Sequence, residues 1–317
     1  MQMYFRSFGT IWEQDPKYRF YYILKELKMT ELLPRVKSGW LRATLFFIAA
    51  FISSQIFAGI GMVLILIVSG FDLSALSNQD QIMEELNQIN FFLPLKIIEF
   101  LSVMLCVWLF MRFIDRKPLR SIGLDLKGYE NDLKLGLALG AGLIALGFFI
   151  LFILGYLSVD GFSFPLGTIL LYFLLFVVVS FHEEIMVRGY ILNNLMQSTN
   201  RYVALVVSSV LFMSIHLLNP NINFLATLNL FLAGIVLGIY YIHKSNLWLP
   251  IGMHLTWNFF QGPVFGFEVS GIEAESIINQ SVSGSDLLTG GAFGFEGSLL
   301  CTFAIVLMIL YLDKKYK

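Results

Sequence analysis

Residues 169–189 read ILLYFLLFVVVSFHEEIMVRG, an apolar run that ends in a group of charged and titratable side chains. A helix that crosses the hydrocarbon core of a bilayer needs about 20 predominantly apolar residues. The apolar part, residues 169–179, is shorter than this. It can cross the bilayer only as part of a longer helix that includes the polar residues after it. Ionisable groups at membrane depth are costly and usually have a partner or a function. The stretch therefore predicts a membrane helix that carries functional side chains.

The composition of the whole chain points to the same environment. Of its 317 residues, 57% are hydrophobic, 14% are charged and 31 are Phe, and the mean hydropathy is +0.75. A soluble domain of this length cannot bury so much apolar surface, so the lipid bilayer is the expected partner. The net charge is −1 and there is no basic tract, which argues against nucleic acid. Cys106 and Cys301 lie far apart in apolar runs and indicate neither a disulfide framework nor a metal site.

Eight stretches are apolar enough to be candidate spans, so we expect an all-α, polytopic transmembrane helical bundle. They are residues 43–68, 91–113, 133–159, 165–180 and onward, 202–218, 224–242, 247–265 and 298–312.

The distribution of Lys and Arg predicts the orientation of these spans, because short basic loops stay in the cytoplasm. Basic residues are concentrated in residues 1–42, 112–134, 188–201 and 314–317, whereas the connections at 80–85, 160–164 and 219–223 and the acidic segment 268–296 have none. Eight spans with both termini cytoplasmic satisfy every connection. We expect an interfacial or cytoplasmic segment over residues 1–40, a single membrane domain over 41–317, and a location in the bacterial cytoplasmic membrane.

Three predicted helices carry polar side chains that lipid would reject. On the fourth, Glu184 and Arg188 are four residues apart and so share a face, in the order that favours an ion pair, while Glu183 points about 100° away. The fifth carries His216, and the seventh carries His254 and Asn258, which are again four apart. Helix bundles place such polar patches together in their interior.

These residue types suit peptide-bond hydrolysis. A glutamate in a dry cavity can act as a general base on water, and a neighbouring histidine can share the proton or orient the water. A second histidine and an asparagine can donate hydrogen bonds to the oxyanion of a tetrahedral intermediate. No Ser or Cys is paired with a base, so the pattern favours a mechanism without a covalent intermediate and without a cofactor.

Three motifs, in this order along the chain, resemble those of the CAAX protease and bacteriocin-processing family of membrane endopeptidases, also called the Abi family. They are two glutamates and an arginine, an aromatic and a histidine, and a histidine and an asparagine: Glu183-Glu184-x-x-x-Arg188, Phe212-x-x-x-His216 and His254-x-x-x-Asn258. The resemblance covers about 80 residues, from 181 to 260, and sets a protease-like core at about 165–262.

The resemblance implies an all-helical intramembrane endopeptidase that acts on a peptide or a membrane-anchored protein. By that analogy Glu183 and His216 activate the water, and His254 with Asn258 stabilises the oxyanion. Glu184 and Arg188 are structural or assist the site. Eukaryotic members remove the last three residues of prenylated proteins, and bacterial relatives are linked to bacteriocin maturation and self-immunity, so the substrate stays open.

Other functions fit the same residues. The motifs could be retained as packing in a non-catalytic immunity or scaffold protein. Zinc could bind to His216, His254 and a glutamate, although the zincin pattern fails because Met186 stands where its second histidine would be. A transporter could use the acids and histidines as a proton relay, but the polar pattern does not repeat between the two halves of the chain.

The proposed site makes one strict demand on the fold. His216 lies about 14 residues into its span, roughly 20 Å from the cytoplasmic end. Glu183 reaches that depth only if its helix continues well past Arg188. We therefore predict one helix over residues 165–196.

Overall fold

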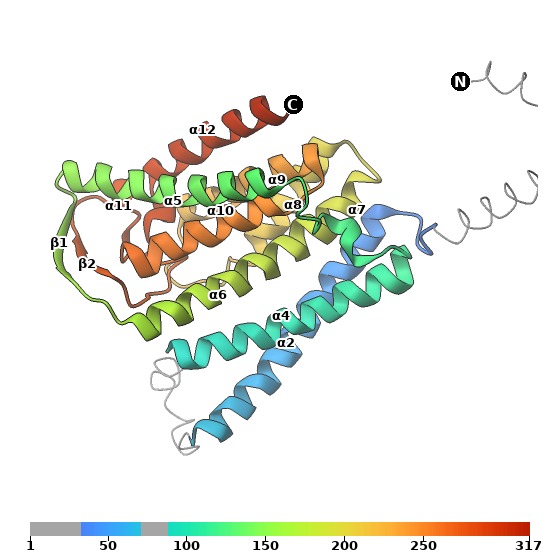
Figure 1. The fold of residues 1–317 in the computed structure, drawn as a ribbon, viewed down its shortest axis with the longest axis horizontal. Helices are drawn as coiled ribbons and strands as arrows, with labels where there is room; N and C mark the ends of the chain where they lie inside the picture. Colours follow the sequence, from blue (N-terminus) through green and yellow to red (C-terminus); the bar gives the residue numbers. More distant parts are fainter. Residues whose placement is uncertain (1–32, 71–87) are drawn as a thin grey trace, which may run out of the picture.

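The computed structural model describes residues 33–70 and 88–317, and in this part of the chain nearly all regular structure is helical (Figure 1). The predicted segment 1–40 therefore lies mostly outside the described residues, as does the connection at 71–87. The elements are α2 (Gly39–Ser69), α4 (Ile89–Leu109), η2 (Phe110–Asp115), η3 (Leu119–Ile122), α5 (Glu130–Ile153), β1 (Leu157–Phe162), α6 (Leu166–Glu184), η4 (Ile185–Leu192), α7 (Asn193–Met196), α8 (Arg201–Ser214), α9 (Phe224–Lys244), α10 (Trp248–Phe259), η5 (Phe260–Val264), β2 (Ile278–Val282), α11 (Asp286–Thr289), η6 (Gly291–Phe293), η7 (Phe295–Gly297) and α12 (Leu299–Tyr316).

Five of the described helices are long and apolar enough to cross a membrane: Gly39–Ser69, Ile89–Asp115, Glu130–Ile153, Leu166–Met196 and Phe224–Lys244. They confirm a multi-pass membrane protein. The other three predicted stretches correspond to α8, to α10 with η5, and to α12. The total of eight spans stays a prediction.

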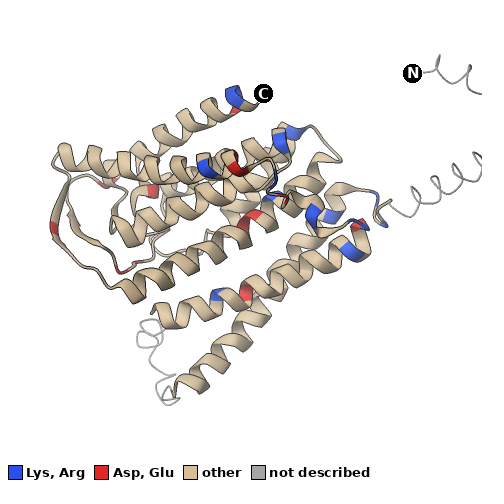
Figure 2. Ribbon diagram, in the orientation of Figure 1, with Lys and Arg blue, Asp and Glu red and all other residues tan. Residues whose placement is uncertain are grey.

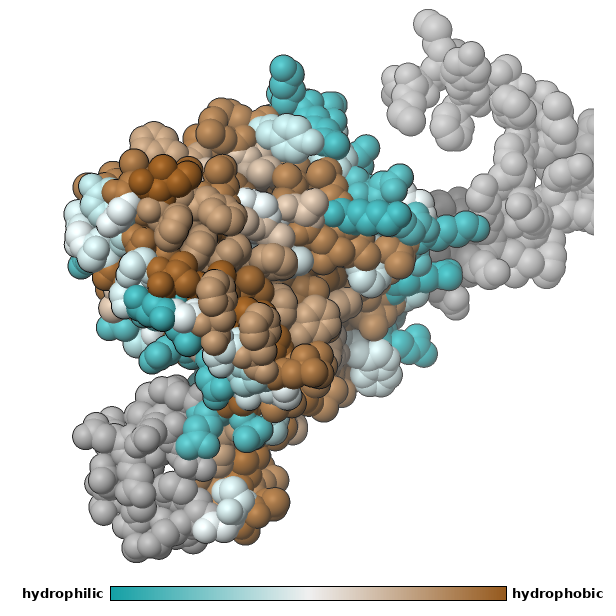
Figure 3. All heavy atoms as spheres, turned by 60° about the vertical axis from the view of Figure 1, so that its left-hand side comes forward, coloured by the Kyte–Doolittle hydropathy of each residue, from teal (hydrophilic) through white to brown (hydrophobic). Residues whose placement is uncertain are grey.

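The surface of the bundle is suited to lipid. Hydrophobic side chains cover most of the face turned forward in Figure 3, and hydrophilic ones gather towards its margins. In the most apolar stretch of α2, only 11% of the residues are buried within the protein. Its exposed residues include Ile56, Ile60 and Val68. Apolar surface of this extent requires an apolar solvent.

Charge is distributed unevenly along the bundle. Lys and Arg gather at the end where α2 begins and α12 terminates, with Lys96 as an exception in the middle of α4 (Figure 2). The beginning of α2 and the end of α12 thus lie on the same side of the bundle (Figure 1). This arrangement agrees with an even number of crossings. The assignment of the basic side to the cytoplasm stays a prediction.

The helix that carries the glutamates continues far beyond them, as its role requires. Residues Leu166–Met196 form one uninterrupted helix in which α6 passes into the π-helical turn η4 and then into α7. The prediction for residues 165–196 is therefore confirmed. A π-helical segment within an α-helix frequently marks a functional site. Here it begins at Ile185, directly after the two glutamates.

Two glycines hold α10 close to α5. A side-chain carbon at Gly136 or Gly140 would collide with the carbonyl oxygens of Leu249 and Met253, respectively. Small residues spaced four apart allow this close approach of membrane helices. The hydroxyl of Thr256 adds a hydrogen bond to the Leu137 carbonyl oxygen, at 2.9 Å. The position of α10 and of its polar side chains is thus set by the backbone of α5.

A buried polar network joins α2 and α4 to the helix of the glutamates. Arg42 on α2 forms an ion pair with Asp115 at the end of η2, and both side chains are only 2% exposed. The Tyr190 hydroxyl on η4 donates to the second oxygen of Asp115 at 2.5 Å. Arg42 also donates to Gln197, at 2.9 Å. Because a buried charge is tolerated only with such partners, the network fixes the ends of three helices together.

The prediction of one span over residues 133–159 is wrong at its C-terminal end. The helix α5 stops at Ile153, and Gly155 with φ +75° turns the chain. Residues Leu157–Phe162 then form β1, which pairs antiparallel with β2. This two-stranded sheet departs from the purely helical prediction. Glycine in the left-handed region is a common helix terminator, and here it overrides the apolar continuation.

The stretch 202–218 is also shorter than predicted as a helix. The helix α8 ends at Ser214, and the following amides of His216, Leu217 and Asn219 bond to carbonyls three residues back, as in tight turns. Pro220 comes next and cannot continue a helix. His216 therefore lies on a turn beyond the helix rather than within it.

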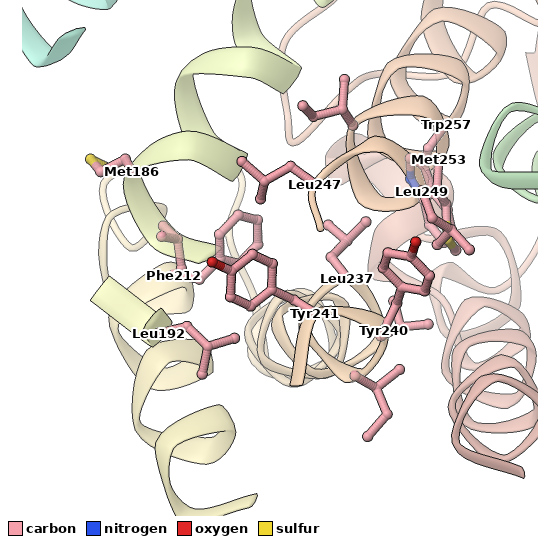
Figure 4. Close-up of a cluster of buried hydrophobic side chains, with 14 of the residues drawn as sticks. Met186, Leu192, Phe212, Leu237, Tyr240, Tyr241, Leu247, Leu249, Met253 and Trp257 are labelled. Atoms are coloured by element: carbon pink, nitrogen blue, oxygen red, sulfur yellow. The ribbon is translucent and has the colours of Figure 1, made fainter. Parts of the chain in front are cut away.

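Behind the polar side chains a continuous apolar core joins η4, α8, α9 and α10. Figure 4 shows Phe212, Leu237 and Tyr241 together within it, Met253 on α10, and Met186 on η4, whose side chain points away from the others. All five are buried. Interiors this closely packed hold their side chains in fixed positions. The core therefore provides a rigid support for the site.

Candidate active site

Four of the polar motif residues line one cavity of about 300 Å³ in the interior of the bundle. Its walls come from α2, α4, α6, η4, α8, α9 and α10, and from the segment after η5. Apolar side chains such as Phe47, Phe92 and Phe176 form much of the lining. Glu183, His216, His254 and Asn258 are all part of it, whereas Glu184 and Arg188 lie behind the wall.

Two histidine nitrogens face one oxygen of Glu183. The distance from Glu183 Oε2 to His216 Nε2 is 3.7 Å, and to His254 Nε2 it is 3.9 Å. Glu183 Oε2 is buried and makes no hydrogen bond to any residue that the structure describes. Polar atoms more than about 3.5 Å apart can be joined through a water molecule that bonds to both. The three atoms thus form a polar pocket suited to one water.

The orientation of His216 follows from a backbone contact. Its Nδ1 lies 2.8 Å from the carbonyl oxygen of Phe212. A carbonyl oxygen can only accept, so Nδ1 carries the hydrogen and donates. In the neutral ring Nε2 then has a free lone pair directed at Glu183 and can accept a proton from water.

His254 is held by a chain of buried charges. Its Nδ1 lies 2.9 Å from Glu184 Oε1, and Arg188 Nη1 donates to the same oxygen at 2.8 Å. Arg188 also donates to the Gly234 carbonyl oxygen at 3.2 Å, and both Glu184 and Arg188 are fully buried. The pair, expected to be structural or assisting, thus contacts the site through His254. It fixes which nitrogen of that ring faces the cavity.

The aromatic ring of Phe212 connects these groups. The Arg188 guanidinium lies over the ring at 4.4 Å. The ring centroid is 4.8 Å from that of His216 and 6.4 Å from that of His254. A cation over an aromatic face is stabilised electrostatically, most strongly when water is excluded. An aromatic residue four positions before His216 therefore packs against the arginine and both histidines at once.

Asn258 lies one turn after His254 on α10 and lines the same cavity. It is 7% exposed and has no hydrogen bond to another described residue. A side-chain amide has two N–H donors. Both are therefore available to a group that enters the cavity.

Sequence reasoning missed several residues of the cavity wall. Trp257 donates from Nε1 to Glu296 at 3.0 Å, and Ser270 donates to the same carboxylate. Lys96 and Glu99, three residues apart on α4, form an ion pair at 2.8 Å and face this cavity. Their spacing was recognisable in the sequence. The contacts of Glu296 join distant segments and gave no local signal.

The same residues include the side-chain types that bind metal ions. Among residues 33–70 and 88–317, no group of three or more His, Cys, Asp or Glu is arranged to hold a metal ion. Glu183, His216 and His254 do approach one another, but through separations of 3.7 and 3.9 Å. Metal independence stays a prediction.

The comparisons with known proteins address the same part of the chain. A search of curated proteins and a search of solved structures each found no match. Residues 165–260 match a protein family described as type II CAAX prenyl endopeptidase Rce1-like. All three motifs lie within the match, since they extend from Glu183 to Asn258. Residues 165–260 of this membrane protein are thus similar to the Rce1-like family of type II CAAX prenyl endopeptidases, in agreement with the resemblance carried by the three motifs.

Proposed function

We propose that this protein is an intramembrane endopeptidase in which Glu183 and His216 activate a water molecule. The observation that carries the proposal is the approach of two histidine Nε2 atoms to the unpartnered Oε2 of Glu183, at 3.7 and 3.9 Å, inside a cavity among membrane helices. The match to an endopeptidase family supports the reaction class.

The mechanism follows from the directions of the side chains. His216 Nε2 contacts the water molecule and orients it, and Glu183 accepts a proton from this water. The resulting hydroxide attacks the carbonyl carbon of the peptide bond. Asn258 donates to the oxyanion that forms, and His254 as an imidazolium, neutralised by Glu184, donates from Nε2. The intermediate then collapses. The C–N bond breaks, and the proton held by Glu183 passes to the leaving amine.

The substrate we propose is a peptide segment of a membrane-anchored protein. The cavity combines a polar centre with apolar walls and lies within helices whose outer surfaces are apolar. A lipid-modified or membrane-tethered chain can reach such a site from the bilayer. The family description names prenyl endopeptidases, which makes prenylated peptides the first substrates to test.

The test uses purified protein in detergent or vesicles with a panel of membrane-tethered peptides, prenylated and unprenylated. We expect cleavage that a strong chelator leaves unchanged, and less than one equivalent of bound zinc by metal analysis. Loss of cleavage on chelation, restored by zinc, would establish the zinc-dependent alternative. Equal biological activity of wild type and Glu183→Ala would instead support a scaffold or immunity protein.

A separate expectation concerns the oxyanion. We expect Asn258→Ala to lower kcat by about 10²- to 10³-fold, the usual effect of removing one oxyanion donor. Steady-state kinetics on the best peptide measures it. The control is Asn279→Ala, since Asn279 is an exposed asparagine of β2 outside the cavity. A kcat of Asn258→Ala within twofold of wild type would remove Asn258 from the mechanism.

A further inference from the structure

The segment that follows the family match forms one wall of the cavity. Residues 269–272 make a tight turn in which the amides and carbonyls of Val269 and Ile272 pair, at 2.9 and 3.0 Å. Ser270 and Gly271, at its tip, have φ angles of +51° and +83°. Val269, Ser270 and Ile272 all line the cavity. Residues outside 165–260 therefore complete the site.

The carboxylate of Glu296 fastens this turn to α10. Its Oε2 accepts from the backbone amide of Ser270 at 3.0 Å and from the hydroxyl of Ser270 at 2.7 Å. Its Oε1 accepts from Trp257 Nε1 at 3.0 Å. Hydrogen bonds to an ionised acceptor are about twice as strong as neutral ones. Trp257 directly precedes Asn258 and lies on the helix that carries His254.

The same turn contacts the stretch of chain that carries His216. The Asn219 side chain donates to the Ser270 carbonyl oxygen at 3.3 Å, and the Asn219 amide bonds to the His216 carbonyl oxygen at 3.0 Å. Gly271 packs so closely on the Pro220 carbonyl oxygen that a side chain there would collide. His216 is anchored to the end of α8 by its bonds to the Met213 and Phe212 carbonyl oxygens, and the contacts of the turn with Asn219 and Pro220 support the chain that follows it.

We propose that Glu296 is a positioning residue, which through the turn 269–272 sets the separation of His216 and His254 around Glu183. The carboxylate is linked to α10 by one oxygen and to the turn by the other, so it connects the two histidine-bearing segments. Displacement of a reacting group by about 1 Å can cost about 10²-fold in rate. This inference rests on the proposed endopeptidase function.

The test compares three variants with a matched control. We expect Glu296→Ala and Trp257→Phe each to lower kcat by about 10- to 100-fold with KM within about threefold. Glu296→Gln, which keeps one oxygen acceptor, should fall between Glu296→Ala and wild type. The control Gln280→Ala removes a hydrogen bond of the same segment, to the Gly266 carbonyl oxygen at 3.0 Å, and should keep kcat within about twofold.

A second measurement does not depend on hydrolysis. The rate at which diethyl pyrocarbonate modifies His216, followed by mass spectrometry, should rise several-fold in Glu296→Ala and Trp257→Phe but not in Gln280→Ala. Thermal unfolding in detergent should show all variants folded at the assay temperature. An unchanged modification rate in folded Glu296→Ala and Trp257→Phe would overturn the inference. Absence of cleavage by the wild type would instead overturn the proposed function.

Discussion

Glu183→Gln is expected to reduce peptide hydrolysis by at least about 10³-fold while leaving the protein folded. The amide has the shape of the carboxylate but cannot accept the proton of the attacking water, and general-base catalysis contributes about 10²- to 10⁴-fold. Glu183 Oε2 has no hydrogen-bond partner among residues 33–70 and 88–317, so the substitution breaks no hydrogen bond of that atom there. Single-turnover cleavage of a membrane-tethered peptide measures the effect.

The comparison for this prediction is Glu273→Gln, which removes a carboxylate from the wall of the same cavity. It should retain readily measurable hydrolysis, because no histidine nitrogen is paired with Glu273 in the described part of the chain. A Glu183→Gln variant that keeps more than a tenth of wild-type activity would show that another group activates the water.

Arg188→Met is expected to destabilise the protein by about 3–5 kcal/mol, because it removes the arginine that pairs with the buried Glu184 carboxylate and leaves only His254 beside it. Both side chains are fully buried, and the pair lies at 2.8 Å. The double variant Glu184→Leu with Arg188→Met removes both charges. It should regain much of the stability, since apolar replacement of a buried pair is often neutral. Equilibrium unfolding in mixed micelles measures both.

Activity separates the two roles of this pair. In the double variant His254 loses the acceptor that lies 2.9 Å from its Nδ1, so we expect kcat to stay about 10²-fold below wild type even where the fold is restored. Full recovery of both stability and kcat would make the pair purely structural. A matched reference is Asp115→Asn, which perturbs the other buried ion pair, with Arg42, far from the histidines in the chain.

Features that depend on local sequence could be predicted. The i, i+4 spacing of Glu184 and Arg188, and of His254 and Asn258, places each pair on one helix face, and the structure agrees. The continuation of the helix past Arg188 was also required by the depth of His216. Helix ends were less predictable. Gly155 turns the chain just after α5, and α8 ends at Ser214, in both cases where hydropathy alone predicts continuation.

The residues that complete the site were not predictable, because their contacts join parts of the chain that are distant in sequence. Glu296 meets Trp257 and Ser270 only after the segment beyond η5 folds back onto the cavity. Its carboxylate resembles any other acidic residue of a polar loop when it is seen in sequence. The same holds for Gly234, whose carbonyl oxygen accepts from Arg188 because α8 and α9 pack closely there.

The sequence by itself determined the lipid solvent and the helical class, and it predicted the reaction chemistry and the family resemblance, because hydropathy and short-range spacing are local properties of a chain. Only the tertiary structure decided that the Nε2 atoms of His216 and His254 both face Glu183, since ring orientation depends on the Phe212 carbonyl and the Glu184 carboxylate. It also placed His216 on a turn outside α8, where residues 270 and 271 contact Asn219 and Pro220 just after it. Such positions result from packing between separate segments, which no local pattern encodes.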